Sequence, residues 1–436
     1  MTAKTLLRGG CVLTLGRTNF AEADVLIDGD KIVEVGPGLR ARDAEIVDAA
    51  DTIVMPGFVD SHRHVSESLF RNFGDSSSSA VYGQHYQSED AYAATLIGLL
   101  GAIDAGITTV VDWFELGPGD GRLDAVLQAH SDSGIRSVLA NATPPWTPGG
   151  DLSQSDLRSL TSAGTGNPLL TLAAGAPTPT SSSLEQVAAD WALARELGLR
   201  IHAHVGIDPN AAQGVVGDLS AGGLLSGDVT FVQCTHLSDA DFDAIASSGV
   251  AVSLTPSSGM SGGQTSPPMQ ELIDRGIRPG LGVGSEQTSP GDMFAQMRAV
   301  ISVQHATLFD LKLAGKAGIP TLLNTREVLR YATIEGARAA GVDGVVGPLA
   351  PGRQADLIML RTDRPNIFPI NDPIGAVVWG MDTSNVDWVF VAGRPLKRAG
   401  VLQGDVARAT DLANTAQRRV AEAAGLLVDA ASTGAR

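Results

Sequence analysis

Hydrophobic and polar positions follow two different periods along the chain. Residues 1–55 contain short alternating runs bounded by glycine and aspartate, namely "TLLRGGCVLTL", "ADVLIDGDKIVEVG" and "DTIVMPGFVD". Such runs predict strands of an antiparallel sheet. The same pattern returns in "GRQADLIMLRTD" (352–363) and "VDWVFVAGRPLKRAG" (386–400). We therefore predict one small β-sandwich domain formed by both chain ends, residues 1–55 together with 350–404.

Between these ends, helical and strand patterns alternate. The amphipathic run "EDAYAATLIGLLGAIDAG" ends at a glycine and is followed by the apolar run "ITTVVDWF". Later pairs are "SLEQVAADWALARELG" with "LRIHAHVG", and "DADFDAIASSG" with "VAVSLTP". Repeated helix-then-strand units predict a parallel sheet, and this many favour an α/β fold of the (β/α)8 TIM-like barrel type. We assign residues 56–349 to the barrel and 405–436 to a C-terminal helix packed outside it.

Amino-acid composition restricts the expected binding partners more than it restricts the fold class. The net charge of −17 disfavours nucleic acid and anionic membrane surfaces, which leaves a small molecule as the expected substrate. The sequence has no apolar run long enough to span a membrane and no signal segment at its start. Cys11 and Cys234 are too few for a disulfide framework. We therefore expect a cytoplasmic location.

Histidines supply the first chemical signal. In "VDSHRHV", His62 and His64 lie two residues apart, so on a strand their side chains point the same way. His202 and His204 repeat this spacing in "LRIHAHVG". Because barrel enzymes place their chemistry at the carboxyl ends of strands, the two pairs predict a metal site. Alternatively, one pair binds metal and the other consists of hydrogen-bonded core residues. His130, at the end of a helical pattern, is expected at the surface or as a cap.

Longer motifs carry a resemblance to a known family. "VMPGFVDSHRHV" together with "GPLAPGRQADLIML" resembles the amidohydrolase superfamily. "TTVVDW", "PGDMFAQMRA" and "SNVDWVFVAGR" resemble its cytosine deaminase-like and molinate hydrolase-like branch. The resemblance covers nearly the whole chain and implies metal ligands from a first-strand His-x-His pair, strand-five and strand-six histidines, and a strand-eight aspartate. His62, His64 and His204 match the first three of these positions.

The remaining positions depart from the family pattern. The strand-six position holds Gln233, and a histidine follows three residues later as His236. The strand-eight position holds Gly284, and a carboxylate follows two residues later as Glu286. Deaminase members carry a glutamate three residues after the strand-five histidine, where this chain has Ile207. The departures predict a site rebuilt from neighbouring residues of the right chemical type.

We predict a nitrogen-rich site in which Glu286 and His236 are also catalytic. The predicted metal ligands are His62, His64, His202, His204, His236, Glu286 and His305. Histidine and carboxylate ligands without the family's base suit iron and oxygen activation. In this respect the chain resembles the amidohydrolase-fold non-haem diiron monooxygenase of platensimycin-type diterpenoid biosynthesis. That resemblance implies two Fe ions, O2, an electron donor and an apolar, diterpenoid-type coenzyme A-ester substrate.

Two other functions stay open. One is a metal-dependent hydrolase of an amide, carbamate or cyclic C–N bond, with Glu286 as base and one Zn, Co or Fe ion. The other is a non-catalytic binding protein whose barrel has lost its catalytic activity. The segment "LLTLAAGAPTPT" contains no lysine that could be carboxylated to bridge two metal ions, so a carbamate-bridged metal pair is not expected. The family resemblance also suggests a homodimer.

Overall fold

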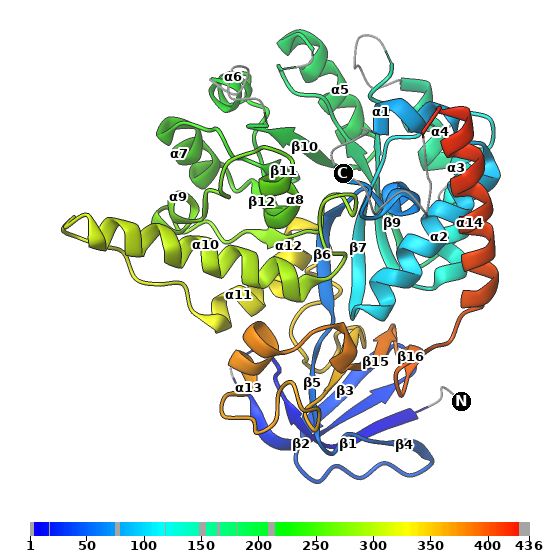
Figure 1. Ribbon diagram of the computed structural model, residues 1–436, viewed down its shortest axis with the longest axis vertical. Helices are drawn as coiled ribbons and strands as arrows, with labels where there is room; N and C mark the ends of the chain where they lie inside the picture. Colours follow the sequence, from blue (N-terminus) through cyan, green and yellow to red (C-terminus); the bar gives the residue numbers. More distant parts are fainter. Residues whose placement is uncertain are drawn as a thin grey trace, which may run out of the picture.

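The computed structural model describes residues 4–16, 18–74, 79–117, 119–147, 154–163, 166–180, 182–207 and 214–426. Two sheets organise these residues, a barrel and a second sheet built from both ends of the chain (Figure 1). Among the described residues, no helix is both long enough and apolar enough to cross a membrane.

The barrel is one eight-stranded sheet in which sequential strands are neighbours. All of its pairings are parallel. Its strands are β6 (Phe58–Arg63), β7 (Ile107–Phe114), β8 (Arg136–Ala142), β9 (Leu170–Gly175), β10 (Arg200–Val205), β11 (Val229–Gln233), β12 (Ala251–Leu254) and β13 (Gly280–Leu281). A bridge between Arg63 and Gly284 brings the first and last strands together and nearly closes the barrel. The predicted (β/α)8 barrel is confirmed.

Helices surround the barrel and close its two ends. They are α2 (Ser88–Asp104), α3 (Arg122–Ser133), α4 (Gln154–Ala163), α5 (Leu184–Glu196), α6 (Val215–Ala221), α7 (Asp239–Ser248), α8 (Pro256–Ser261), α9 (Met269–Asp274), α10 (Met293–Leu313), α11 (Thr325–Tyr331) and α12 (Ile334–Ala339). Strands such as β7 and β8 are buried along their whole length, because helices cover one face and the barrel interior covers the other. Continuous apolar runs are the sequence signature of such strands.

The second sheet has nine strands and joins the two chain ends. Its strands are β1 (Lys4–Val12), β2 (Phe20–Asp28), β3 (Lys31–Gly36), β4 (Ala44–Asp48), β5 (Thr52–Pro56), β14 (Leu357–Arg361), β15 (Val386–Val391), β16 (Arg394–Arg398) and β17 (Val401–Leu402). β5 pairs with β14 in antiparallel fashion, which confirms the predicted union of the ends. The sheet is mixed and not purely antiparallel, because β1 pairs in parallel with both β4 and β5.

The link between the two sheets places the first metal-binding motif. β5 passes through Gly57 into β6, and a Cβ atom at Gly57 would collide with the side chain of Thr108. The Pro-Gly-Phe sequence is therefore needed for the two strands to pass this close to β7. Between β6 and α2 lie η1 (Val65–Phe70), α1 (Ser79–Tyr82) and η3 (Gly83–His85).

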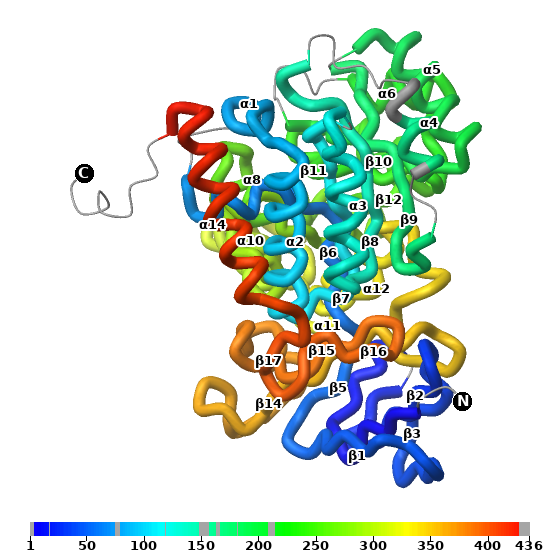
Figure 2. Tube along the Cα trace, turned by 90° about the vertical axis from the view of Figure 1, so that its right-hand side faces the viewer, coloured from blue at the N-terminus to red at the C-terminus, as the bar shows by residue number. Residues whose placement is uncertain are grey.

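The remaining elements close the ends of the molecule. α13 (Pro373–Gly375), η4 (Ala376–Gly380) and η5 (Thr383–Asn385) connect β14 to β15. α14 (Val406–Ala423) runs along α2 on the outside of the barrel, as Figure 2 shows, and Arg419 forms an ion pair with Asp90 there. Residues 427–436 of the predicted C-terminal helix lie outside the described residues. The domain boundaries themselves stay predictions.

Candidate metal centre

Three imidazoles converge at the mouth of the barrel. His62 belongs to β6 and is fully buried, His64 follows directly after β6, and His204 belongs to β10. Nε2 of His62 lies 3.0 Å from Nε2 of His204 and 3.3 Å from Nε2 of His64. The three form a group whose ligand atoms all lie within 4.8 Å of one another. The match of these residues to the first three family positions thus agrees with their grouping in space.

This grouping fits a bound metal ion better than a hydrogen-bonded cluster. A neutral imidazole has one N–H, and Nδ1 of His62 is buried with no hydrogen-bond partner among the described residues. Zinc binds imidazole nitrogen at about 2.0–2.1 Å, so two such ligands at a tetrahedral angle lie about 3.4 Å apart. The observed separations of 3.0 and 3.3 Å are close to that spacing. Three imidazoles are also a ligand set that zinc accepts.

The three histidines differ in the direction in which their surroundings shift the pKa. Burial and the neighbouring imidazoles lower the pKa of His62 well below its usual range. Burial and His64 together lower the pKa of His204 to about 3. Burial alone would lower the pKa of His64, but the carboxylates of Glu115 and Glu67 outweigh it and raise that pKa to about 9. His62 and His204 are therefore neutral and have a free lone pair at neutral pH.

A buried chain of polar residues supports the segment after His64. Oδ1 of Asp112, on β7, accepts a hydrogen bond of 3.3 Å from the backbone N–H of Val65. Oδ2 of Asp112 lies 2.9 Å from Nε2 of His130, whose Nδ1 lies 2.7 Å from the Ser137 hydroxyl. The prediction that His130 lies at the surface is wrong, because its ring is fully buried and joins α3 to two barrel strands.

Two glutamates that the sequence analysis did not single out lie on the other side of His64. Nδ1 of His64 is 3.4 Å from Oε1 of Glu115 and 4.0 Å from Oε1 of Glu67. His64, Glu67 and Glu115 form a second group of closely spaced ligand atoms. Glu115 immediately follows β7, so its place at the carboxyl end of a predicted barrel strand was a signal that could have identified it.

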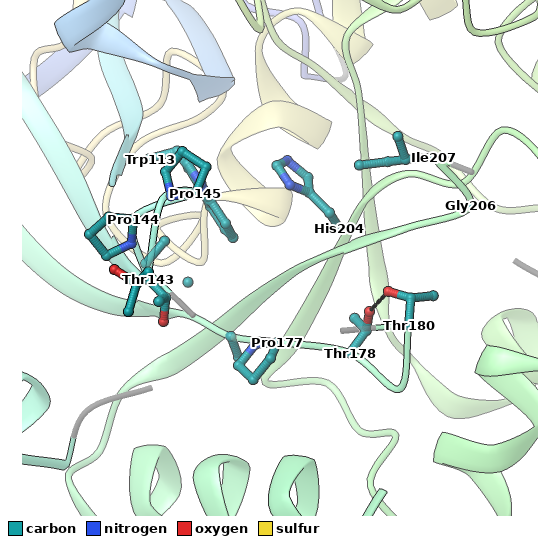
Figure 3. A pocket seen from close by; sticks show the side chains of 14 residues that line it. Trp113, Thr143, Pro144, Pro145, Pro177, Thr178, Thr180, His204, Gly206 and Ile207 are labelled. Carbon is teal, nitrogen blue, oxygen red and sulfur yellow. Dashed lines mark hydrogen bonds between the residues drawn. The ribbon is translucent and has the colours of Figure 1, made fainter. Parts of the chain in front are cut away.

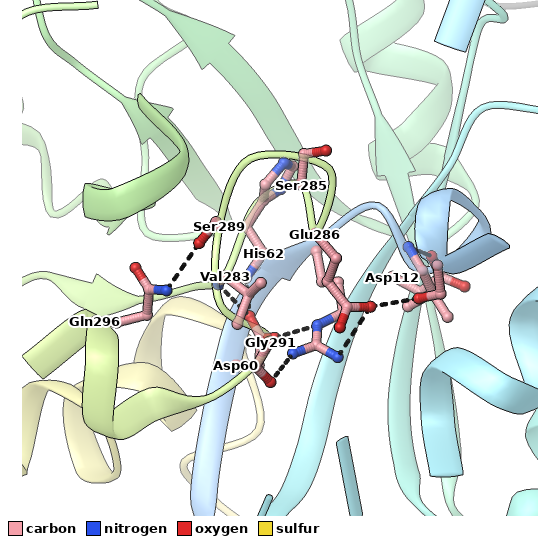
Figure 4. A network of polar contacts seen from close by, with 12 residues as sticks. Asp60, His62, Asp112, Val283, Ser285, Glu286, Ser289, Gly291 and Gln296 are labelled. Atoms are coloured by element: carbon pink, nitrogen blue, oxygen red, sulfur yellow. Dashed lines mark hydrogen bonds and ion pairs between the residues drawn. The ribbon is translucent and has the colours of Figure 1, made fainter. Parts of the chain in front are cut away.

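The structure directs Glu286 to arginines and away from the imidazoles. Its carboxylate accepts a hydrogen bond of 2.9 Å from Nε of Arg71, accepts another from the Ser68 hydroxyl, and lies 3.8 Å from Nη1 of Arg63. Figure 4 shows Glu286 and Asp60 in one network of polar contacts. Arg63 is fully buried and also donates to Asp60 at 2.8 Å. Glu286 belongs to neither group of potential metal ligands. A pair of arginines therefore satisfies the carboxylate that was predicted to bind metal.

The backbone at Gly284 explains why no aspartate stands there. Gly284 has φ +72, in the left-handed region. A Cβ atom on it would lie 2.9 Å from both side-chain atoms of Ser258 and 3.0 Å from Cβ of Thr255. The backbone at this position therefore suits glycine and leaves no room for an aspartate side chain. Gly284 instead uses its backbone N–H and C=O to hold His62 and His64, each at 2.9 Å.

The other predicted ligands do not join the three-histidine group. His202 is fully buried on β10, two residues before His204, and neither ring nitrogen has a hydrogen-bond partner among the described residues. His236 lies in the turn after β11, where its backbone N–H donates to Gly206. His305 lies on α10 and its Nε2 is 2.8 Å from the carbonyl oxygen of Leu323. Because His305 lies on a helix and not at the end of a barrel strand, its side chain packs between helical and loop segments.

A cavity of about 380 Å³ opens beside His204 (Figure 3). The described residues that line it are Trp113, Ala142, Thr143, Pro144, Pro145, Thr147, Gly175, Ala176, Pro177, Thr178, Thr180, His204, Gly206 and Ile207. None of these is an acid, a lysine or an arginine. The ring centroid of Trp113 lies 4.5 Å from that of His204 and 5.4 Å from that of His62, so the indole links the cavity to the imidazoles.

Comparison with known proteins gives one consistent family. Residues 53–396 match the amidohydrolase family. The chain is 29% identical to a 5'-deoxyadenosine deaminase of Methanothermobacter thermautotrophicus, over 91% of this chain and 94% of that protein. It is also 29% identical to a 5-methylthioadenosine/S-adenosylhomocysteine deaminase of Desulfitobacterium hafniense, over 90% and 93% of the two chains.

Solved structures share the fold at lower identity. A zinc-bound adenosine deaminase from Xanthomonas campestris superposes with a TM-score of 0.81 at 21% identity, covering 96% of this chain and 99% of that chain. Atrazine chlorohydrolase from Arthrobacter aurescens in complex with zinc superposes with a TM-score of 0.80 at 24% identity, covering 95% and 100% of the two chains. At these identities the likeness establishes the architecture only.

These findings correct the predicted reaction and its cofactors. The expected diiron monooxygenase is wrong, because the sequence relatives are named deaminases. The predicted two Fe ions are likewise unsupported. The predictions of O2, an electron donor and a diterpenoid-type coenzyme A-ester substrate depended on those ions and have no support either. The inference failed because it treated the site as rich in imidazoles and lacking a base, whereas Glu67 and Glu115 lie beside His64. The match over residues 53–396, together with the barrel and its histidine pair, shows that this chain belongs to the amidohydrolase family.

Proposed function

We propose that this chain is a metal-dependent hydrolase that deaminates a small, neutral, nucleoside-like substrate. The observation that carries the proposal is the convergence of Nε2 of His62, His64 and His204 beside an uncharged cavity. These three residues would hold one ion, with zinc as the first candidate. When bound, such an ion supplies Lewis acidity to a hydrolytic reaction.

The chain's own residues favour a neutral substrate. The cavity of about 380 Å³ is within the usual range for small-molecule sites, about 300–1,000 Å³. Its described lining is made of prolines, threonines, small residues and one indole, so a phosphate or carboxylate would find no cation there. Trp113 excludes water from one side of His204 and offers a flat apolar surface to an aromatic ring. The names of the sequence relatives support a purine nucleoside with an exocyclic amine.

The decisive experiment measures ammonia release from the zinc-loaded chain. We would assay 5'-deoxyadenosine, 5'-methylthioadenosine and S-adenosylhomocysteine in parallel, with and without prior chelation. We expect release of ammonia from at least one of them, with loss of activity after chelation and its return on adding zinc. His204→Ala should lose both zinc and activity, because it removes one of the three ligands.

A matched control is His305→Ala, since His305 lies on α10 and bonds to a backbone carbonyl. It should keep zinc and activity. A chain that binds zinc but releases no ammonia from any of the three would overturn the deaminase assignment. A chain that binds no ion would favour the non-catalytic barrel. A homodimer stays a prediction, which light scattering on the purified chain would test.

A further inference from the structure

Glu67 and Glu115 are buried carboxylates without an ordinary counter-charge. Their exposed fractions are 6% and 7%. Among the described residues, His64 is the single cationic partner within ion-pair distance of either one. Oε1 of Glu115 and Nδ1 of His64 are both buried and have no hydrogen-bond partner within the described part of the chain. Two unpartnered atoms that face each other at 3.4 Å need a common explanation.

The direction of the His64 ring supplies it. Nε2 of His64 points to the three-histidine group, so Nδ1 points to the two carboxylates. If Nε2 binds an ion, the one N–H of the neutral ring must lie on Nδ1. The separation of 3.4 Å from Glu115 is somewhat longer than an N–H···O hydrogen bond of about 2.9 Å, so a small rotation of the ring closes it.

We propose that Glu115, with Glu67 beside it, is the positioning residue for the metal ligand His64. Glu115 accepts the Nδ1–H of His64, which fixes the tautomer and aims the Nε2 lone pair at the ion. This role rests on the proposed metal site at His62, His64 and His204. It differs from the family pattern, in which a strand-eight aspartate binds the metal directly.

Charge balance explains why this chain needs the arrangement. Position 207 is isoleucine and position 284 is glycine, so the two positions at which the family resemblance implies a carboxylate supply no negative charge in this chain. A carboxylate that accepts a hydrogen bond from a ligating imidazole makes that imidazole a stronger ligand. Glu115 and Glu67 therefore return negative charge to the site through His64. They do so from the end of β7 and from η1, on the opposite side of the ring from the ion.

The test measures zinc affinity by competition with a chelator, and the absorption spectrum of the cobalt-substituted protein. Glu115→Gln keeps the shape of the side chain and removes its charge. We expect zinc to bind about 10- to 100-fold more weakly, the usual cost of losing such a partner. Glu67→Gln should weaken binding less, because Glu67 lies 4.0 Å from Nδ1. Glu115→Asp should recover part of the affinity, since the charge is kept at a shorter reach.

A matched control is Glu335→Gln, which alters a buried glutamate on α12 that pairs with Arg330 and belongs to neither group of potential metal ligands. It should leave zinc affinity and the cobalt spectrum unchanged. Thermal melting of the metal-free variants verifies that each is folded. Unchanged zinc affinity in a folded Glu115→Gln would overturn the role of Glu115. Two zinc ions per wild-type chain, with one lost in Glu115→Gln, would also overturn it by making Glu115 a direct ligand.

The outcomes separate this inference from the function it rests on. A wild-type chain that binds zinc normally but is insensitive to Glu115→Gln would contradict only the positioning role. A wild-type chain that binds no zinc would contradict the proposed metal site and this role together. A normal zinc site with the expected effect of Glu115→Gln, but with no deaminase activity, would leave the positioning role standing and remove the proposed reaction.

Discussion

Two sets of buried carboxylates flank β6, and they differ in their counter-charge. Glu286 faces Arg63 and Arg71, whereas Glu67 and Glu115 face an imidazole. All three carboxylates are buried to a similar extent. Burial therefore does not decide what each one does. A carboxylate that pairs with arginines stabilises the fold. A carboxylate that faces an imidazole can instead accept a hydrogen bond from that ring when the ring binds a metal ion.

The pKa values separate Glu67 from the other two carboxylates. Burial by itself raises the pKa of both Glu286 and Glu67. For Glu286, Arg63 and Arg71 outweigh burial and lower the pKa. For Glu67, burial dominates; His64 lowers the pKa, Glu115 raises it, and the net result is a raised pKa. For Glu115, burial raises the pKa, but His64 outweighs burial and the net result is a lowered pKa, as for Glu286. The negative charge beside His64 is therefore carried mainly by Glu115.

The largest expected effect is a loss of stability on removing Arg63, the buried cation that faces Glu286. Arg63→Met leaves both Asp60 and Glu286 without their shared partner in the interior. We expect a loss of about 3–5 kcal/mol in the free energy of unfolding, measured by urea denaturation. Arg398→Met, which removes an exposed pair with Glu45, should cost no more than about 1 kcal/mol. Equal losses in the two variants would show that the arginine network is not structural.

The next effect separates the two sets directly. Glu286→Gln should cost about 1.5–3 kcal/mol of stability, because it weakens charged hydrogen bonds from Arg71 and Ser68. Its zinc affinity should match that of the wild type. Chelator competition on Glu286→Gln and Glu115→Gln side by side measures the contrast. If Glu286→Gln lost as much zinc affinity as Glu115→Gln, Glu286 would return as a candidate ligand and the comparison would fail.

A smaller effect is expected from restoring the family's aspartate. Gly284→Asp should lower stability by about 1–3 kcal/mol, since the residue has φ +72 and no room for a Cβ atom. Zinc affinity should not rise. Gly263→Asp is a matched control, because Gly263 has φ +79 but a Cβ atom there would meet no other atom within 4 Å. A Gly284→Asp chain that was stable and bound zinc more tightly would show that the site can still accept the ancestral ligand.

The smallest effect is a pH dependence. The folded-state pKa of Glu286 is lowered from its ordinary value of 4.5, so its stabilising contribution is complete above that pH. The contribution is lost as the pH falls through the lowered folded-state pKa. The stability difference between wild type and Glu286→Gln should therefore be constant near neutrality and shrink as the pH falls below 4.5. Urea midpoints at a series of pH values measure it, and a difference that grew on acidification would contradict the arginine pairing.

Sequence patterns predicted the architecture and the centre of the site. The alternating runs at both ends, the helix-strand repeats and the pair His62 and His64 each depend on local spacing, and each led to the observed fold or grouping. His204 followed from its place at the end of a strand. Such features are readable because their physical cause, a period of two or 3.6 residues, lies within a few positions of the chain.

What could not be predicted depends on contacts between distant segments. Glu286 has the residue type of a ligand, but Arg63 and Arg71 reach it from more than two hundred positions away. The collision that excludes a side chain at Gly284 comes from Ser258 and Thr255 on a different barrel unit. Glu115 was visible at the end of its strand, yet its importance depends on which way the His64 ring turns.

The position of Trp113 has a practical consequence. Its indole ring packs against His204 and His62 with centroids 4.5 and 5.4 Å away, and it also borders the cavity. Indole fluorescence responds to the charge and contacts of adjacent groups, so filling the centre or the cavity should alter the emission of this residue. The chain has five tryptophans, and a Trp113→Phe variant would isolate the contribution of this one. The protein therefore contains its own optical reporter of occupancy, which can be followed before any product is known.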